Sequence, residues 1–523
     1  MILDSKTATE PVAMGCDVCI VGTGAAGLAI AVELLDTGLN VVLLESGGLE
    51  FESSTQDLYN AEISGLPYPG TITGRFRVCG GSTTRWAGQV LPLMPHDFDR
   101  REWVRFSGWP ISFNDLRPYY ERASKFLLID SMNFDSDLFE YLRARPPAFD
   151  TSQLWYHFSK WSPEPNIRRH YLPRIRHSQS CTMLLHANLK HIILDESLSR
   201  VRSVEVFSLE GRRATVQARA VVLCVGGIET ARLLLANNSQ QPNGIGNDFD
   251  LVGRFFQDHP KAQIGRLTGL DARKAQQWFN SFHKRGQKYT VRCSATPKWQ
   301  REQRALNISM SLEFVDRRSM LQDLKGLYLA LRHGRFEKTD MHRLLRVAAH
   351  PIAAASPVWH FFVRGRSFLP EAEMRIGVFC EQEPDPESRI LLSQSSDALG
   401  MPRANVRWKF TNLTIHTIRL FAQLLCRQFK EAGIGAIELS RELRQPEMPW
   451  TDYISDAYHH MGTTRMHDSP RQGVVNRDCR LHAVSNFYIG SSAVFPTGGH
   501  SNPTFTIIAL SMRIADRLKR ELA

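Results

Sequence analysis

Short apolar runs separated by glycine-rich turns mark the beginning of the chain. Residues 18–21 are consecutively apolar, a glycine-rich turn covers residues 22–27, and residues 28–35 are mostly apolar. A short apolar run between turns is typical of a buried strand, and the longer stretch is typical of a helix. A second apolar run covers residues 41–44. The pattern predicts a β-α-β unit with parallel strands.

The same order of strand, glycine turn and helix recurs over residues 218–235 and predicts a return of the chain to the parallel sheet. Further strands are predicted over residues 183–194 and 203–207. In the middle of the chain, residues 374–380 and 388–393 predict strands that no such turn follows. Long helices are predicted over residues 413–432, where Gly433 follows, and over residues 505–522.

These elements predict an α/β fold, α+β overall, in which a Rossmann-type domain with a parallel sheet is joined to a domain with a large, mostly antiparallel sheet. The 523 residues also exceed what one hydrophobic core usually organises. We expect residues 1–95, 176–260 and 450–523 to build the first domain and residues 261–449 to build the second. Residues 96–175, with a helix over residues 114–126, form an excursion towards the second domain.

The first turn carries chemistry as well as structure. Gly22, Gly24 and Gly27 have the Gly-x-Gly-x-x-Gly spacing, in which glycines permit a tight turn, a close approach to a pyrophosphate, and close helix packing. Glu45 ends the second strand, where an acid holds a ribose hydroxyl and disfavours a phosphorylated ribose such as that of NADP. The alternative is a glycine-rich turn in an ordinary β-α-β unit, but the acid in register favours nucleotide binding.

Charge and cysteine content narrow the class of protein. The formal net charge is +11, but the basic residues are scattered, so nucleic acid is not an expected partner. Nine dispersed cysteines predict reduced thiols and a cytoplasmic protein. Cys16 and Cys19 have the spacing of a metal or redox pair, but no second pair accompanies them, so we expect packing and no metal site. No signal peptide and no transmembrane run is recognised.

One basic stretch differs from the rest of the chain. Residues 317–346 hold eight Lys or Arg residues and three acids, and Leu321, Leu324, Tyr328 and Leu331 follow helical spacing. An apolar segment follows over residues 351–362. Two interpretations of residues 317–366 stay open. One is a solvated helix face beside a core helix, and the other is a lid or a contact surface for a partner subunit or an anionic membrane.

Five motifs occur in an order that resembles the glucose-methanol-choline (GMC) oxidoreductases, flavoproteins that oxidise alcohols. They are the first glycine turn with Glu45, Gly80-Gly81-Ser82, Gly226-Gly227-Ile228-Glu229, Gly253-Arg254 with Asp258-His259-Pro260, and the tail from His459 to Asn502. The tail, with its His-x-x-Gly-Thr and Asn-Pro-Thr patterns, is most similar to the pyranose oxidase and sugar dehydrogenase branch. The resemblance implies FAD as cofactor and a sugar or glycoside hydroxyl as the group oxidised.

The resemblance also implies a set of cofactor-binding residues drawn from the turns and the tail. They are Gly22, Gly24, Ala25, Ala26, Gly27, Glu45, Ser46, Gly80, Gly81, Ser82, Thr83, Trp86, Ala87, Gly88, Leu189, Gly226, Gly227, Ser492, Ala493, Asn502, Pro503 and Thr504. Some relatives link FAD covalently through a His of the loop after Gly80-Gly81. Arg85 stands at that position here, so the FAD is expected to be noncovalent.

Alcohol oxidation removes a hydride and a proton, and only a cofactor such as a flavin, through its N5, can accept the hydride. Histidine is the best side chain to accept the proton near neutral pH. The family pattern selects His459 as this base and Asn502 as the group that orients the hydroxyl. Adjacent residues of an extended segment point oppositely, so His460 is not expected to share that role. His460, His500, Glu381 and Gln382 are weaker candidates for substrate contact.

Alternatives remain open at this point. Glu381 could form a salt bridge with one of many arginines and not touch a substrate. The same flavin chemistry could act on a polyol or sterol, and a non-enzymatic nucleotide-binding module is a third interpretation. The electron acceptor is oxygen or another oxidant.

Overall fold

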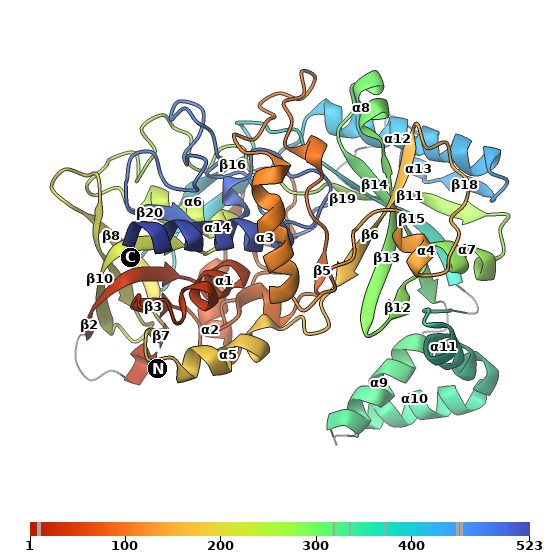
Figure 1. The fold of residues 1–523 in the computed structure, drawn as a ribbon, viewed down its shortest axis with the longest axis horizontal. Coiled ribbons are helices and arrows are strands. Elements are labelled where there is room, and N and C mark those ends of the chain that lie inside the picture. The colour runs from red at the N-terminus through yellow and green to blue at the C-terminus, as the bar shows by residue number, and fades with distance from the viewer. Residues whose placement is uncertain are drawn as a thin grey trace.

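The computed structural model describes residues 1–7, 12–316, 320–333, 336–369, 372–445, 449 and 453–522. It forms two lobes, each built on its own β-sheet, with both labelled termini on the first lobe (Figure 1). Residue 450, where the last segment is predicted to begin, lies outside the described residues, and the division into five segments stays a prediction.

The first lobe is built on a mainly parallel sheet. Its order is β1 (Ile2–Asp4), β7 (Cys181–Leu185), β3 (Val41–Leu44), β2 (Val12–Val21), β10 (Arg213–Leu223), β9 (Val201–Phe207) and β8 (Asn188–Leu194), and β20 (Phe487–Ile489) also pairs with β10. The β10–β9 and β9–β8 pairs are antiparallel, and the other described pairs of this sheet are parallel. Helix α1 (Ala25–Leu34) connects β2 to β3, which confirms the predicted β-α-β unit. Residues 183–194, predicted as one strand, are interrupted at His186, whose φ of 52° turns the chain.

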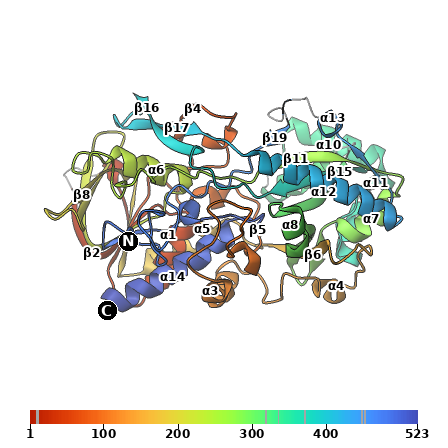
Figure 2. The same cartoon turned by 90° about the horizontal axis from the view of Figure 1, so that it is seen from above.

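Helices and a small sheet lie on opposite sides of the first lobe (Figure 2). Helix α14 (Thr504–Leu522) packs on α1, α3 (Phe113–Phe126) packs on α14, and α5 (Ile167–His177) packs on α1. Helix α6 (Gly227–Ala236) contacts the three-stranded sheet of β16 (Arg389–Ser396), β17 (Pro402–Arg407) and β4 (Glu62–Ile63). Strand β16 was expected within the block that carries the large antiparallel sheet. It lies in this separate sheet because it pairs with β17, which pairs with β4.

The second lobe is built on the predicted antiparallel sheet. Its order is β18 (Ala436–Leu439), β11 (Lys261–Thr268), β15 (Ala372–Cys380), β14 (Ile308–Asp316), β13 (Gln287–Ala295), β6 (Leu154–Trp161) and β5 (Gln89–Val90). Helices α12 (Asn412–Glu431) and α7 (Ala272–Phe279) pack against it. The excursion over residues 96–175 is divided, because α3 packs on the first lobe and β6 enters the second sheet.

Three helices project from the second lobe, α9 (Met320–His333), α10 (Lys338–Ala349) and α11 (Pro351–Arg364) (Figure 1). They cover most of the basic stretch, of which residues 317–319 and 334–335 lie outside the described residues. The remaining short elements are α2 (Ser53–Gln56), α4 (Leu138–Tyr141), α8 (Pro297–Gln303), α13 (Arg441–Arg444), β12 (Phe282–Lys284) and β19 (Ile454–Ser455). Among the described helices, none combines the length and the apolar character needed to cross a bilayer.

Candidate active site

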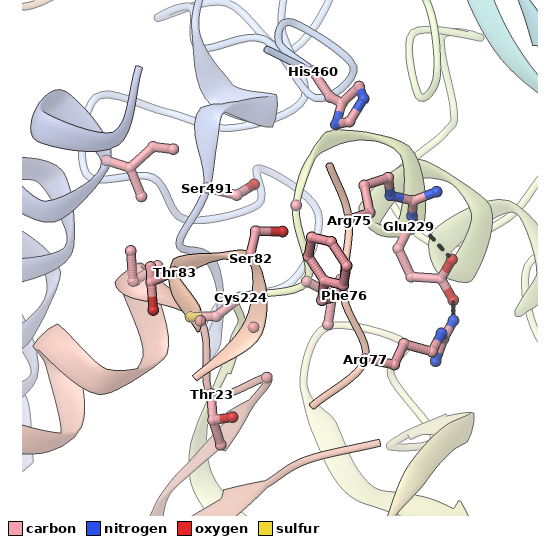
Figure 3. A pocket seen from close by; sticks show the side chains of 18 of the residues that line it. Thr23, Arg75, Phe76, Arg77, Ser82, Thr83, Cys224, Glu229, His460 and Ser491 are labelled. Carbon is pink, nitrogen blue, oxygen red and sulfur yellow. Dashed lines mark hydrogen bonds and ion pairs between the residues drawn. The ribbon is translucent and has the colours of Figure 1, made fainter. Parts of the chain in front are cut away.

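A cavity of about 600 Å³ opens where the first glycine turn, the loop over residues 73–89 and the tail meet (Figure 3). Its walls come from segments far apart in the chain, since Gly22, Glu45, Gly226 and Asn502 all line it. The strand ends of β2, β3 and β10 therefore converge on one space, as expected for a ligand site at the carboxyl edge of a parallel sheet.

The turn between β2 and α1 admits only glycine at two positions. Gly22 has a φ of +100°, and an added Cβ would lie 2.6 Å from the carbonyl oxygen of Cys224. At Gly27 an added Cβ would lie 1.9 Å from the carbonyl oxygen of Gly22. At Gly24 it would meet nothing within 4 Å, and Gly24 lines the cavity. None of the described side chains caps α1, so its first N–H groups can bind a phosphate of a dinucleotide.

Glu45 ends β3 on the wall of the same cavity and is buried. One carboxylate oxygen accepts hydrogen bonds from the backbone N–H of Thr23, at 3.1 Å, and from its hydroxyl, and the other accepts from the N–H of Gly47 at 2.9 Å. Burial raises the pKa of Glu45, although these donors oppose it. The Thr23 hydroxyl also accepts a hydrogen bond from Gly80 at 3.0 Å, so Thr23 joins the two predicted cofactor loops. The apolar pattern of β2 gave no indication of this role.

Most of the cofactor residues implied by the resemblance line the cavity. They are Gly22, Gly24, Ala25, Ala26, Glu45, Ser46, Gly81, Ser82, Thr83, Trp86, Ala87, Leu189, Gly226, Asn502 and Thr504. The others, Gly27, Gly80, Gly88, Gly227, Ser492, Ala493 and Pro503, are not among the lining residues. Ser492 donates its hydroxyl hydrogen to the carbonyl oxygen of His460, and Gly490 and Ser491 line the cavity in place of Ser492 and Ala493.

The two predicted catalytic residues meet at the cavity wall. The side-chain nitrogen Nδ2 of Asn502 lies 3.4 Å from Nε2 of His459, and both residues line the cavity. On the other side of the ring, Nδ1 of His459 lies 2.7 Å from Nδ1 of His259. Nε2 of His259 lies 3.4 Å from the carbonyl oxygen of Gly498. Their assignment as catalytic residues stays a prediction, which the geometry allows.

The chain of contacts assigns a tautomer to each ring. A carbonyl oxygen only accepts, so the contact with Gly498 places the hydrogen of His259 on Nε2. Nδ1 of His259 is then an acceptor, and Nδ1 of His459 must carry the hydrogen that it donates. Nε2 of His459 is left with a lone pair towards Asn502 and the cavity. That atom can accept a proton from a bound alcohol.

The surroundings keep His459 neutral. Burial lowers the pKa of His459 well below its usual value, and His259, His460 and Arg292 add to the effect. Burial also lowers the pKa of His259 to about 4. Burial raises the pKa of Asp258 to about 7, and its carboxylate accepts the backbone N–H groups of His459 and Ala457 at 3.1 Å. Asp258, His259 and His459 could together hold a metal ion, but these hydrogen bonds already occupy the same ligand atoms.

His259 is therefore expected to affect both rate and pH dependence. His259→Leu should slow flavin reduction by substrate about two- to fivefold, because both tautomers of His459 then become populated and only one leaves Nε2 unprotonated. Its loss also removes one influence that lowers the pKa of His459, so the fall in rate at acid pH should begin at a higher pH. His259→Asn, whose amide oxygen can accept from Nδ1 of His459, should recover part of the rate. Rapid mixing over a pH series measures both effects. A wild-type rate in His259→Leu would contradict the tautomer assignment, and an unchanged pH profile would contradict the effect of His259 on the pKa of His459.

The weaker substrate candidates lie in different surroundings. His460 lines the cavity, and its ring packs between Tyr68 and Phe256. His500 lies away from the cavity wall, with Nδ1 3.0 Å from Oδ1 of Asn307 and Nε2 3.2 Å from Nε2 of His157.

Glu381 and Gln382 are not among the lining residues either. Glu381 is fully buried and accepts two hydrogen bonds from Arg101, at 2.7 and 2.6 Å. It therefore forms the salt bridge with an arginine that was the alternative to a substrate contact. The Gln382 amide donates to the carbonyl oxygens of Phe256 and Lys409 and accepts from Asp258 N–H and the Trp408 indole. Both side chains are thus committed to protein groups.

A buried cluster of charged side chains at the cavity wall was not predicted from the sequence. Arg77 donates to Glu229 at 2.8 Å, Arg232 donates to the same carboxylate, and Arg75 lies 3.8 Å from it (Figure 3). Burial would raise the pKa of Glu229, but the three arginines outweigh it and lower the pKa to about 2. Arg75 and Arg77 also lie over the ring of Tyr59. Only the Arg-x-Arg spacing before Gly80 hints at this cluster, and that spacing is common on solvated loops.

Comparisons with known proteins agree with this architecture. Two family models described as GMC oxidoreductase match residues 165–261 and 384–511. The fructose dehydrogenase large subunit of Gluconobacter japonicus is 23% identical over 97% of this chain and 98% of its own length. The 2-methyl-1,2-propanediol dehydrogenase of Mycolicibacterium austroafricanum is 24% identical over 97% and 96%. A variant of Aspergillus oryzae formate oxidase superposes with a TM-score of 0.57 at 17% identity, covering 98% of this chain and 99% of that one.

Proposed function

Because the chain belongs to the GMC oxidoreductase family, we propose that it is an FAD-dependent enzyme that oxidises a primary or secondary hydroxyl of a sugar or glycoside to the carbonyl. One observation carries the proposal. A neutral histidine nitrogen, Nε2 of His459, turns its lone pair towards the side-chain amide of Asn502 on the wall of a cavity that the glycine-rich turn also lines.

The residues present fit FAD. The free N–H groups at the start of α1 and the open space at Gly24 suit its pyrophosphate, and the carboxylate of Glu45 suits a ribose hydroxyl. Bound FAD would supply the hydride acceptor that no side chain can provide. Helix α14 begins at Thr504 on the same wall, and the positive end of its dipole favours negative charge in the cavity.

A side chain of the protein accepts the proton of the substrate hydroxyl. Nε2 of His459 accepts the hydroxyl proton as the carbon–hydrogen bond breaks, and His259 keeps that nitrogen unprotonated beforehand. The amide of Asn502 cannot take a proton, so it orients the hydroxyl towards His459 by hydrogen bonding. Both side chains are half-buried on the cavity wall, where a bound substrate can reach them.

The substrate class is the part that most needs an experiment. One relative is named for fructose and another for a small diol, so a sugar is preferred and a non-sugar polyol is the second candidate. A panel of sugars, glycosides, polyols and sterols should be mixed with the purified yellow protein without oxygen. Bleaching by sugars supports the proposal, and bleaching by other alcohols alone supports the second candidate. Repeating the panel with oxygen and with an artificial acceptor distinguishes an oxidase from a dehydrogenase. A purified protein that contains no flavin would contradict both candidates.

The cofactor is proposed to be bound without a covalent link. The loop after Gly80-Gly81 has no histidine, and Arg85 lies with its guanidinium over the rings of Phe51 and Phe76. Acid precipitation should therefore release all of the yellow colour into the supernatant. Flavin that stays in the washed pellet after denaturation would contradict this expectation.

We also propose a cytoplasmic location, which the nine cysteines support because all of them are free thiols. A contact of residues 317–366 with a partner subunit or a membrane surface is likewise a proposal.

A further inference from the structure

The projecting helices leave large apolar side chains uncovered. On α10, Met341, Leu344 and Leu345 follow helical spacing and are 52%, 45% and 62% exposed. On α11, Trp359 and Phe362 lie on one such stripe and are 47% and 79% exposed. An amphipathic helix normally turns this face to a core, and contiguous exposed apolar surface usually marks an interaction site.

These stripes are not what holds the three helices together. Arg346 of α10 forms two hydrogen bonds with Asp323 of α9, at 2.8 and 2.6 Å. An added Cβ on Gly326 would lie 2.8 Å from the guanidinium of Arg343, so the glycine lets α9 and α10 approach closely. Helix α11 joins the lobe at its end, where the N–H of His283 donates to Gly365 at 2.6 Å. The apolar stripes are thus free for another surface.

The charges on this unit are arranged asymmetrically. Two of its acids, Asp323 and Asp340, are each only 3% exposed and paired with an arginine, whereas the third, Glu337, is exposed. Lys325, Lys338 and Arg364 are exposed. Residues 317–366 contain ten Lys or Arg residues and three acids, so this segment carries a net positive charge.

A second cavity, of about 280 Å³, lies between α7 and the end of α11. Arg273, Arg364 and Arg366 line it together with hydroxyl, amide and imidazole groups, and none of its described lining residues is acidic. Ser356, His360 and Arg364 lie at intervals of four on α11, so the cavity borders the helix face next to Trp359. The guanidinium of Arg364 lies 4.9 Å above the Trp359 ring. A cavity lined by three arginines therefore adjoins the exposed apolar stripe.

We propose that α9, α10 and α11 dock this enzyme onto an anionic phospholipid bilayer. The apolar stripes enter the boundary between headgroups and acyl chains, and the cationic residues contact the headgroups. The arginine cavity receives the phosphate of one lipid, because arginine binds phosphate through paired donors. A second copy of the chain is disfavoured as occupant, since two cationic surfaces would repel each other. The inference concerns a surface remote from the cofactor cavity and does not depend on the substrate.

The test is flotation of the holoenzyme with vesicles. Neutral phosphatidylcholine vesicles are compared with vesicles that contain about one quarter phosphatidylglycerol, at about 0.1 M and about 0.5 M salt. Binding should be at least about tenfold stronger to the anionic vesicles at low salt. Leu345→Ser combined with Phe362→Ser should lower it at least about tenfold. Arg273→Gln combined with Arg364→Gln should lower the preference for anionic vesicles several-fold.

Matched substitutions on the first lobe provide controls. Phe249→Ser removes a side chain that is 42% exposed, and Arg176→Gln removes an exposed charge from α5, so neither should alter vesicle binding. Unchanged flavin content shows that each variant is folded. Equal binding to both vesicle types, or none, would overturn the proposal. If the wild type is an oligomer that dissociates in the Leu345→Ser, Phe362→Ser variant, the surface contacts a second copy of the chain. If inorganic phosphate releases the wild-type enzyme from the vesicles although its apolar stripes are intact, the arginine cavity is only a site for free anions.

Discussion

His459→Ala should slow the reduction of bound flavin by substrate about 10²- to 10⁴-fold, which is the usual contribution of a general base. Nε2 of His459 is the unprotonated ring nitrogen that faces Asn502 and the cavity, so the variant loses the proton acceptor. The flavin content should stay normal, because the glycine turn and Glu45 lie on other elements of the cavity wall. Rapid mixing without oxygen isolates this step from reoxidation.

His460→Ala is the matched control, since it removes the neighbouring imidazole. That ring packs against Tyr68 and Phe256 and makes no contact with Asn502 among the described hydrogen bonds. Its loss should cost stability and leave flavin reduction within about tenfold of the wild type. If His460→Ala is the slow variant and His459→Ala is not, the base is His460. If both variants reduce flavin normally, the base lies outside the tail.

Glu381→Gln should destabilise the protein by about 3–5 kcal/mol, the usual cost of leaving one partner of a buried ion pair alone. Arg101 is 6% exposed, and it would keep its charge without a counterion. Burial raises the pKa of Glu381, but Arg101 outweighs it and holds the pKa below its usual value. The pair therefore contributes its stability above the unfolded pKa of about 4.5, and this contribution is lost as the pH falls through the lower folded pKa.

Denaturant unfolding measures this loss, and Glu383→Gln provides the control from the same segment. Glu383 pairs with Arg105, whose side chain is 62% exposed, so water can solvate the charge that remains. About 1 kcal/mol is expected there. A Glu381→Gln protein of wild-type stability, with a KM raised only for its substrate, would instead restore Glu381 as a substrate contact.

The sequence was sufficient for the first β-α-β unit because its signals are local. The apolar run before Gly22, the glycine spacing and Glu45 all lie within one β-α-β unit, and each has a direct physical meaning. The antiparallel sheet of the second lobe was also predicted. The place of β16 was not, because an alternating strand pattern is the same in either sheet and does not indicate its pairing partner.

Contacts between distant residues account for most of what the sequence did not show at the site. The His259 ring meets His459 across two hundred positions, and Arg77 meets Glu229 from another segment. Glu381 illustrates the same limit, because an acid at a strand end can face either a ligand or an arginine. Arg101 decides between these only in the folded chain. Local patterns identify residue types suited to chemistry, and tertiary pairing decides which of them remain available.

The positions of β20 and α14 determine when the first lobe can be completed during synthesis of the chain. Strand β20 completes the sheet beside β10, and α14 packs on α1, although the ribosome translates them long after both partners. The first lobe must therefore wait with an open sheet edge and an uncovered helix while the whole second lobe emerges. Contacts of such large sequence separation fold slowly and leave partly folded chains exposed to aggregation and chaperones. The wall that carries His459 and Asn502 forms only with this last step, so a nascent chain has no complete cofactor cavity until its tail has docked.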